Sequence, residues 1–102
     1  MKQKFVKGVK FDNSKSRWEL LPYREVEEVV KVLTSGAKKY TDNNWMLVVK
    51  KGKMRYFSAA LRHLVAWKLG RKVDEETKLH PLAHAICCLL FLIWIDKENN
   101  ES

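Results

Sequence analysis

The stretch HPLAHAICCLLFLIWI, residues 80–95, decides the fold of this chain. Pro81 suits the first turn of a helix because its missing N–H is not needed there. Every residue from Ala85 to Ile95 is apolar, and a helix that is apolar on all sides must be covered on all sides. A membrane-spanning helix needs about 20 apolar residues, which is more than this run offers. We therefore predict a core helix that does not cross a membrane and that other copies of the chain help to cover.

Two further amphipathic helices are predicted upstream. The first covers roughly residues 22–35 and places apolar residues at helical spacing: Val26, Val29, Val30 and Leu33. Gly36 is a candidate C-cap, although the alanine and the lysines after it could continue a turn. The second covers residues 54–69, stops at Gly70, and has an apolar face formed by Tyr56, Ala60, Leu64 and Trp67. The segment TDNNW, residues 41–45, is typical of a loop.

The chain of 102 residues is predicted to be one all-α domain with about three main helices. Residues 1–21 lack helical periodicity and are expected to form an extended arm, followed by a helical body over 22–96 and a flexible tail over 97–102. The adjacent Cys87 and Cys88 are poorly placed to bridge each other, so we expect buried free thiols and a cytoplasmic location.

The charge of the chain is strongly positive, with 20 Lys and Arg residues against 12 Asp and Glu, which gives a net charge of +8. Such a surface attracts phosphates on nucleotides, nucleic acids or membranes, but it does not define a fold. The plain alternative is a solvated basic surface without a ligand.

Histidines and carboxylates gather in two places that suit a divalent cation. His80 and His84 lie one turn apart at the start of the apolar helix, shortly after Asp74, where they could bind a metal ion, an anion or both. Glu25 and Glu28 share a face of the first helix, an arrangement that presents oxygen ligands to Mg²⁺. In the alternative without a ligand, the histidines cap and pack the helix edge and the glutamates form a solvated first turn.

A second set of side chains suits a phosphorylated, base-containing ligand. It combines cations that grip phosphates with a base-reading amide and with rings that stack. Its members are Lys39, Tyr40, Asn44, Trp45, Arg55, Arg62 and His63. The alternative for Tyr40 and Trp45 is packing within the loop.

The order of four motifs resembles a known family. KFD…LLP is followed by VLTSGAKKYTDNNW, then RYFSAALRHLVAW, then HPLAHAICCLLFL, from about Val9 to Leu92. This order is similar to that of the small phage and bacterial dATP/dGTP diphosphohydrolases, which are thought to be related to MazG-like all-α pyrophosphohydrolases. The resemblance implies a helical bundle that works as a homo-oligomer, a dimer or tetramer. It also implies Mg²⁺- or Mn²⁺-dependent hydrolysis of dATP or dGTP to the monophosphate and pyrophosphate.

On this interpretation, Glu28 and His84 are the catalytic residues, and the metal ligands are Glu25, Glu28, Asp74, His80 and His84. The chain departs from the MazG-like pattern on its last helix, where His84-x-x-Cys87 stands in place of Glu-x-x-Asp. The metal set must therefore be a changed one, or catalysis has been lost. The alternative function is a small basic accessory protein that binds nucleic acid or a nucleotide without turning it over.

Overall fold

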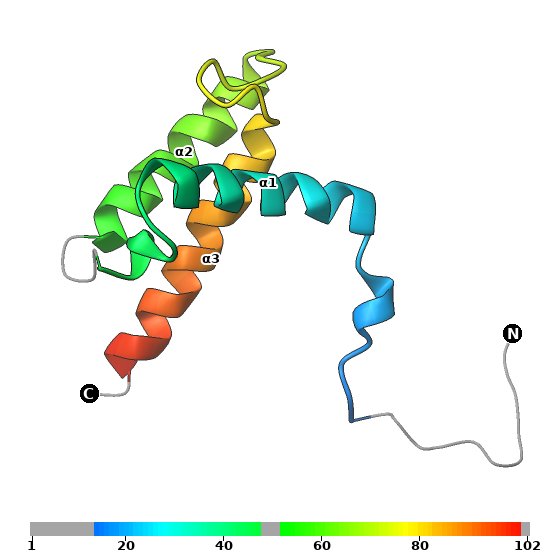
Figure 1. The fold of residues 1–102 in the computed structure, drawn as a ribbon, viewed down its shortest axis with the longest axis vertical. Coiled ribbons are helices and arrows are strands. Elements are labelled where there is room, and N and C mark those ends of the chain that lie inside the picture. The colour runs from blue at the N-terminus through cyan, green and yellow to red at the C-terminus, as the bar shows by residue number, and fades with distance from the viewer. Residues whose placement is uncertain (1–13, 48–51, 101–102) are drawn as a thin grey trace, which may run out of the picture.

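The computed structural model describes residues 14–47 and 52–100, and every regular element among them is helical (Figure 1). In chain order they are the 3-10 helix η1 (Trp18–Leu20), α1 (Tyr23–Lys39), the 3-10 helix η2 (Asn44–Leu47), α2 (Gly52–Lys68) and α3 (Pro81–Asn100). The prediction of an all-α chain with about three main helices is confirmed.

Helices α2 and α3 run antiparallel and pack along each other, while α1 crosses over α3 (Figure 1). Helix η1 and the start of α1 extend away from the α2–α3 pair, and Trp18 of η1 is 74% exposed. Part of the arm predicted for residues 1–21 is thus seen as residues 14–21, which contain one turn of helix; residues 1–13 lie outside the described residues.

The core of one chain is small and centres on the crossing of α1 and α3. Val29 of α1 packs against Ala83 and Cys87 of α3, whose short side chains let the two helices approach. The Cys87 thiol donates a hydrogen bond to the Val29 carbonyl oxygen at 3.5 Å. Burial raises the pKa of the Cys87 thiol to about 12, so this sulfur stays protonated and unreactive. Cys87 and Cys88 are both free and buried, as predicted.

Two helices extend beyond their predicted ends. Helix α1 continues past Gly36 to Lys39, and the Tyr40 N–H bonds the Gly36 carbonyl oxygen at 2.9 Å. The helix is extended because alanine and lysine are strong helix formers and lysines near a C-terminus interact favourably with the helix dipole. Residues 97–100, predicted as part of a flexible tail, continue α3 to Asn100.

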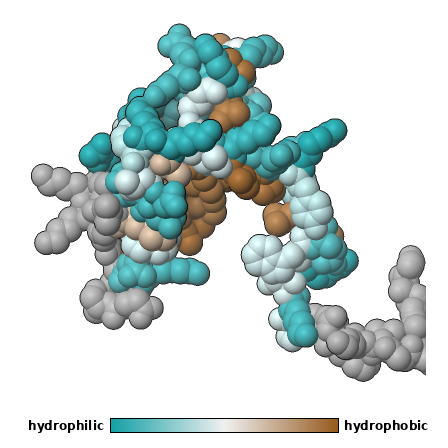
Figure 2. Space-filling model, in the orientation of Figure 1, coloured by the Kyte–Doolittle hydropathy of each residue, from teal (hydrophilic) through white to brown (hydrophobic). Residues whose placement is uncertain are grey.

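Each helix of the antiparallel pair keeps an apolar stripe at its surface. Figure 2 shows apolar side chains gathered on the surface below α1. On α3 the stripe consists of Ile86, Leu89, Leu90 and Ile93, each more than two-fifths exposed. On α2 it consists of Phe57, Leu61, Leu64 and Val65. Both sets follow helical spacing, so each forms one continuous face of its helix. No helix in the described ranges has the length and apolar content that crossing a membrane requires.

Candidate functional site

A cavity of about 790 Å³ lies between the C-terminal half of α1, the turn after it and α3. Five residues of the predicted site line it: Lys39, Tyr40, Asn44, Trp45 and His84. They come from three separate segments, because α1 carries its C-terminal end across α3 and the chain then turns back toward α2. The fold thus brings these five residues to one cavity, and their roles there stay predictions.

One wall of the cavity is aromatic. The Trp45 ring stacks on Phe91 with centroids 4.4 Å apart and meets Trp94 edge-on at 5.2 Å. Tyr56 of α2 packs edge-on against the same Phe91 ring and donates a hydrogen bond to the Trp45 carbonyl oxygen at 3.5 Å. Trp45 therefore packs against the wall, as in the alternative without a ligand, and also lines the cavity, so its role in stacking on a base stays a prediction.

The loop between α2 and α3 is closed by its own backbone. The Asp74 N–H bonds the Leu79 carbonyl oxygen at 2.8 Å, and the Lys78 N–H bonds the Asp74 carbonyl oxygen at 2.8 Å. Lys78 has a left-handed backbone with φ of 63°, which completes the turn. The Asp74 carboxylate accepts the N–H groups of Glu76 and Thr77, both at 3.0 Å. This loop therefore holds Thr77 in a fixed position beside α3.

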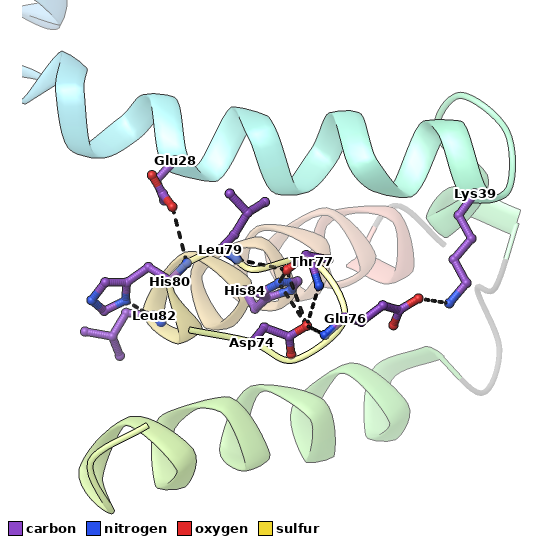
Figure 3. Close-up of polar contacts among 9 residues, drawn as sticks. All are labelled: Glu28, Lys39, Asp74, Glu76, Thr77, Leu79, His80, Leu82 and His84. Carbon is purple, nitrogen blue, oxygen red and sulfur yellow. Dashed lines mark hydrogen bonds and ion pairs between the residues drawn. The ribbon is translucent and has the colours of Figure 1, made fainter. Parts of the chain in front are cut away.

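Thr77 links the loop to His84 on α3 (Figure 3). Its Oγ1 lies 2.7 Å from His84 Nε2 and donates to Asp74 Oδ2 at 3.3 Å. His84 Nε2 is also 3.9 Å from Asp74 Oδ2, and the His84 side chain is only 14% exposed. On its other side the ring stacks on His63 of α2, with centroids 4.8 Å apart. His84 is thus a nearly buried imidazole with an oriented partner on Nε2.

The local environment sets the charge states of this cluster. Burial alone would raise the pKa of Asp74, but hydrogen bonds from Thr77 and Glu76 and the proximity of His84 lower it below its usual range overall. Burial lowers the pKa of His63, and the neighbouring His84 lowers it further. The cluster therefore combines an ionised carboxylate with an imidazole, His63, that resists protonation.

The N-terminus of α3 is satisfied within the chain. The His80 N–H bonds Glu28 Oε2 at 3.3 Å, the Leu82 N–H bonds His80 Nδ1 at 3.0 Å, and the Ala83 N–H bonds the His80 carbonyl oxygen at 3.0 Å. Pro81 has no N–H to offer. His80 therefore caps α3, as in the alternative in which the histidines bind no ligand. This helix end has no free donor left for an anion.

The remaining predicted residues lie outside the cavity lining. Glu25 pairs with its neighbour Arg24 at 3.6 Å on the exposed start of α1. Arg62 donates to Ser58 on the surface of α2 at 3.3 Å, and Arg55 is exposed on the same helix. His63 reaches the site only through its stacking on His84.

The five predicted metal ligands do not converge in one chain. Within residues 14–47 and 52–100 there is no group of three or more His, Cys, Asp or Glu side chains placed to hold a metal ion. The side chains of Asp74 and His84 approach each other, but their facing atoms are already hydrogen-bonded to Thr77. The Glu28 carboxylate reaches the backbone N–H of His80, which is no metal ligand. The described side chains of a single chain therefore do not fit a metal centre.

Two residues not predicted from the sequence belong to the site. Glu76 lines the cavity and forms an ion pair with Lys39 at 2.7 Å (Figure 3), and this contact raises the pKa of Lys39. Thr77 lines it too. The signal for Thr77 was its place three residues after Asp74, the spacing at which an Asx side chain reaches later backbone N–H groups.

The described part of the chain is thus all-α and has a concave, aromatic-walled cavity lined by a lysine and a nearly buried histidine. The family model described as dATP/dGTP diphosphohydrolase, N-terminal, matches residues 6–102. The chain therefore belongs to this family, as the motif order indicated.

One curated relative is similar over most of this chain. It is a protein of Salmonella phage PMBT28 described as a dATP/dGTP diphosphohydrolase, 37% identical over 89 residues, which is 86% of this chain and 29% of the relative. The chain thus spans less than a third of that relative's length. No solved structure matches the chain.

Proposed function

We propose that this chain hydrolyses dATP or dGTP to the monophosphate and pyrophosphate. The observation that carries the proposal is the cavity that His84 lines together with Lys39, Tyr40, Asn44 and Trp45. The family to which the chain belongs and the description of its phage relative support the same class of substrate.

The nucleoside is assigned to the aromatic side of the cavity. Its volume of about 790 Å³ lies within the usual range of about 300–1,000 Å³ for small-molecule sites. Asn44 offers both a donor and an acceptor to a base edge, and Tyr40 offers a ring surface. Trp45, held by Phe91 and Trp94, supplies a rigid wall for this part of the ligand.

The phosphates are assigned to the side of the cavity that carries Lys39. In the absence of substrate this ammonium group is paired with Glu76, so an incoming phosphate replaces one anionic partner by another. Arg55 and Arg62 lie outside the cavity lining and are assigned to the general attraction of an anionic substrate, together with the net charge of +8.

His84 is assigned as the general base. A water oxygen bonds to the α-phosphorus, the bond from that phosphorus to the bridging oxygen breaks, and pyrophosphate leaves with the bond electrons. His84 takes the proton of the water, and the Asp74 carboxylate 3.9 Å away stabilises the resulting imidazolium. Glu28, whose carboxylate accepts the His80 N–H, is assigned to holding α1 on α3 rather than to proton transfer.

The substrate is proposed to arrive as its Mg²⁺ or Mn²⁺ complex, since Mg²⁺ in such reactions is held mainly by phosphate oxygens and waters with only one or two carboxylates. Protein ligands to that cation would have to come in part from another copy, because the predicted ligands do not converge among the described residues of one chain.

A homo-oligomer is proposed because the exposed stripes of α2 and α3 leave a small core in each chain. Ile86, Leu89, Leu90 and Ile93 form one face of α3, and a second copy that covers it would bury the apolar surface predicted from the sequence to need covering.

The decisive experiment incubates the purified chain with each deoxynucleoside triphosphate and Mg²⁺ or Mn²⁺ and separates the products. Monophosphate and pyrophosphate in equal amounts, lost on addition of a chelator, would support the proposal. Diphosphate and phosphate would contradict it. Binding of dATP or dGTP without turnover, or salt-sensitive binding of nucleic acid alone, would favour the non-catalytic alternative.

A further inference from the structure

We infer that Thr77 is a positioning residue that holds His84 in the tautomer protonated on Nε2, which leaves the lone pair on Nδ1. The consequence for catalysis rests on the proposed function of His84. The tautomer itself follows from the hydrogen bonds around one hydroxyl group.

The Thr77 hydroxyl has one proton to donate and two lone pairs with which to accept. It has three polar neighbours: the Leu79 N–H at 3.3 Å, Asp74 Oδ2 at 3.3 Å and His84 Nε2 at 2.7 Å. The Leu79 N–H can only donate. An ionised carboxylate can only accept, so the hydroxyl proton goes to Asp74. The contact with His84 is then satisfied only if Nε2 carries the proton and donates it to Thr77.

The opposite arrangement is less favourable. If the hydroxyl donated to His84 Nε2, an oxygen lone pair of Thr77 would face the Asp74 carboxylate at 3.3 Å without a proton between them. The carboxylate does not turn away easily, because the same Oδ2 accepts two backbone N–H groups of the loop. These contacts thus form a chain of two hydrogen bonds. His84 Nε2–H donates to the Thr77 hydroxyl oxygen, and the Thr77 hydroxyl donates to the Asp74 carboxylate.

This arrangement decides which nitrogen of His84 does chemistry. With Nε2–H tied to Thr77, a proton from water can be taken only on Nδ1. The new positive charge is then offset through Thr77 by Asp74, as the aspartate of a catalytic triad offsets its histidine. Thr77 does not touch the reacting atoms in this scheme; it selects the atom of His84 that does.

The tautomer is tested on the wild-type chain without substrate. Long-range ¹H–¹⁵N spectra of ¹⁵N-histidine-labelled protein at neutral pH distinguish a protonated ring nitrogen from one with a lone pair. We expect His84 to be protonated on Nε2. A His84 ring protonated on Nδ1 would overturn the inference, whatever the activity of the protein.

The role of Thr77 is tested with Thr77→Val and Thr77→Ser. In Thr77→Val the His84 signals should move toward a mixture of tautomers, and Thr77→Ser should restore the wild-type pattern. His80 is an internal control, because its Nδ1 accepts the Leu82 N–H and its tautomer does not depend on Thr77. Unchanged His84 signals in Thr77→Val would overturn the role of Thr77.

Turnover separates this inference from the proposed function. Thr77→Val should lower kcat about tenfold or more with little change in KM, as expected when a catalytic histidine loses its oriented tautomer. Thr77→Ser should recover most of kcat. A protein with His84 protonated on Nε2 but no turnover of any nucleotide would refute the proposed function and leave the tautomer standing.

Discussion

The imidazole rings of His63 on α2 and His84 on α3 stack with their centroids 4.8 Å apart and their planes 23° apart. Because both rings belong to the packed pair of long helices, this contact joins the candidate catalytic residue to the α2–α3 interface. Burial at this interface and the neighbouring His84 both lower the pKa of His63.

The stacked pair predicts a loss of stability in mild acid. Burial and His84 lower the pKa of His63 below its usual value near 6.5, so the unfolded chain binds a proton at a higher pH than the folded chain does. The stabilisation is therefore present above about pH 6.5 and is lost as the pH falls through the lower folded pKa of His63. Thermal unfolding followed between pH 7.5 and 5 should show a falling midpoint. His63→Phe keeps a stacking ring without a titrating group and should flatten this dependence; an equal slope in both proteins would contradict the prediction.

His84→Gln should reduce turnover by about 100-fold or more, because a glutamine cannot accept the proton of the attacking water. Its helix content by circular dichroism should stay near that of the wild type, since the His84 ring is at the edge of the cavity and α3 is packed along its length. His80→Asn is the control variant and should keep most of the turnover, since asparagine can replace the capping interaction of His80. Equal losses of turnover in the two variants would contradict the different roles assigned to the two histidines.

The sequence predicted the helices because their apolar spacing is local, and it missed boundaries where propensity and packing compete. Gly36 illustrates the difference: glycine is a common helix terminator, yet helix-forming residues follow it and α1 continues to Lys39. At the other end of the body, residues 97–100 were predicted as tail from their polarity, but a polar surface turn is compatible with the end of a long helix.

The site could be predicted in part for a similar reason. Residue types predicted Lys39 and Asn44 as nucleotide-binding residues and His84 as a catalytic residue and metal ligand, and the fold brings the three to one cavity. The roles of the carboxylates were harder to predict. Asp74 and Glu28 both accept hydrogen bonds from backbone N–H groups, and these groups come near them only in the folded loop and at the crossing of α1 and α3. Spacing along a chain does not reveal such partners.

The ion pair between Lys39 and Glu76 predicts opposite effects of two substitutions on substrate binding. Lys39→Met should raise KM for the nucleotide several-fold by removing a phosphate partner. Glu76→Gln should lower KM about two- to fivefold, because an exposed ion pair of modest strength no longer competes for the ammonium group. Steady-state kinetics at two salt concentrations checks both.

Lys38 provides the matched control for this pair. It is adjacent, equally charged and outside the residues that line the cavity. Lys38→Met should therefore change KM much less than Lys39→Met does. Equal increases would show that only the total charge of the chain matters.

Different substitutions at Gly36 should affect the stability of the chain and its binding of the nucleotide separately. Gly36 lies inside α1 and lines the cavity, and beyond its adjacent residues and the nearby helix backbone no atom lies within 4 Å of the position that a Cβ would take. Gly36→Ala should stabilise the chain by about 0.5–1 kcal/mol, because alanine loses less backbone entropy in a helix. Gly36→Leu should also fold but should raise KM sharply, since its side chain would enter the space assigned to the nucleoside. Thermal unfolding and nucleotide titration of both variants test this, and unchanged KM in Gly36→Leu would place the nucleoside elsewhere.

The exposed stripe of α3 predicts the state of assembly. Ile93 lies at the C-terminal end of the exposed stripe of α3 and is 52% exposed, although Ile95, two residues further on, is fully buried. A glutamate at position 93 would place a charge in the proposed contact between copies, where it would lose its hydration without gaining a partner. Light scattering after size exclusion should therefore show a dimer or larger species for the wild type and a smaller species for Ile93→Glu. Val73→Glu is the control, because Val73 is exposed to a similar degree but belongs to the loop between α2 and α3. A wild-type chain that stays monomeric at high concentration would refute the proposed oligomer, and an assembly that tolerates Ile93→Glu but not Val73→Glu would move the contact from α3 to the loop.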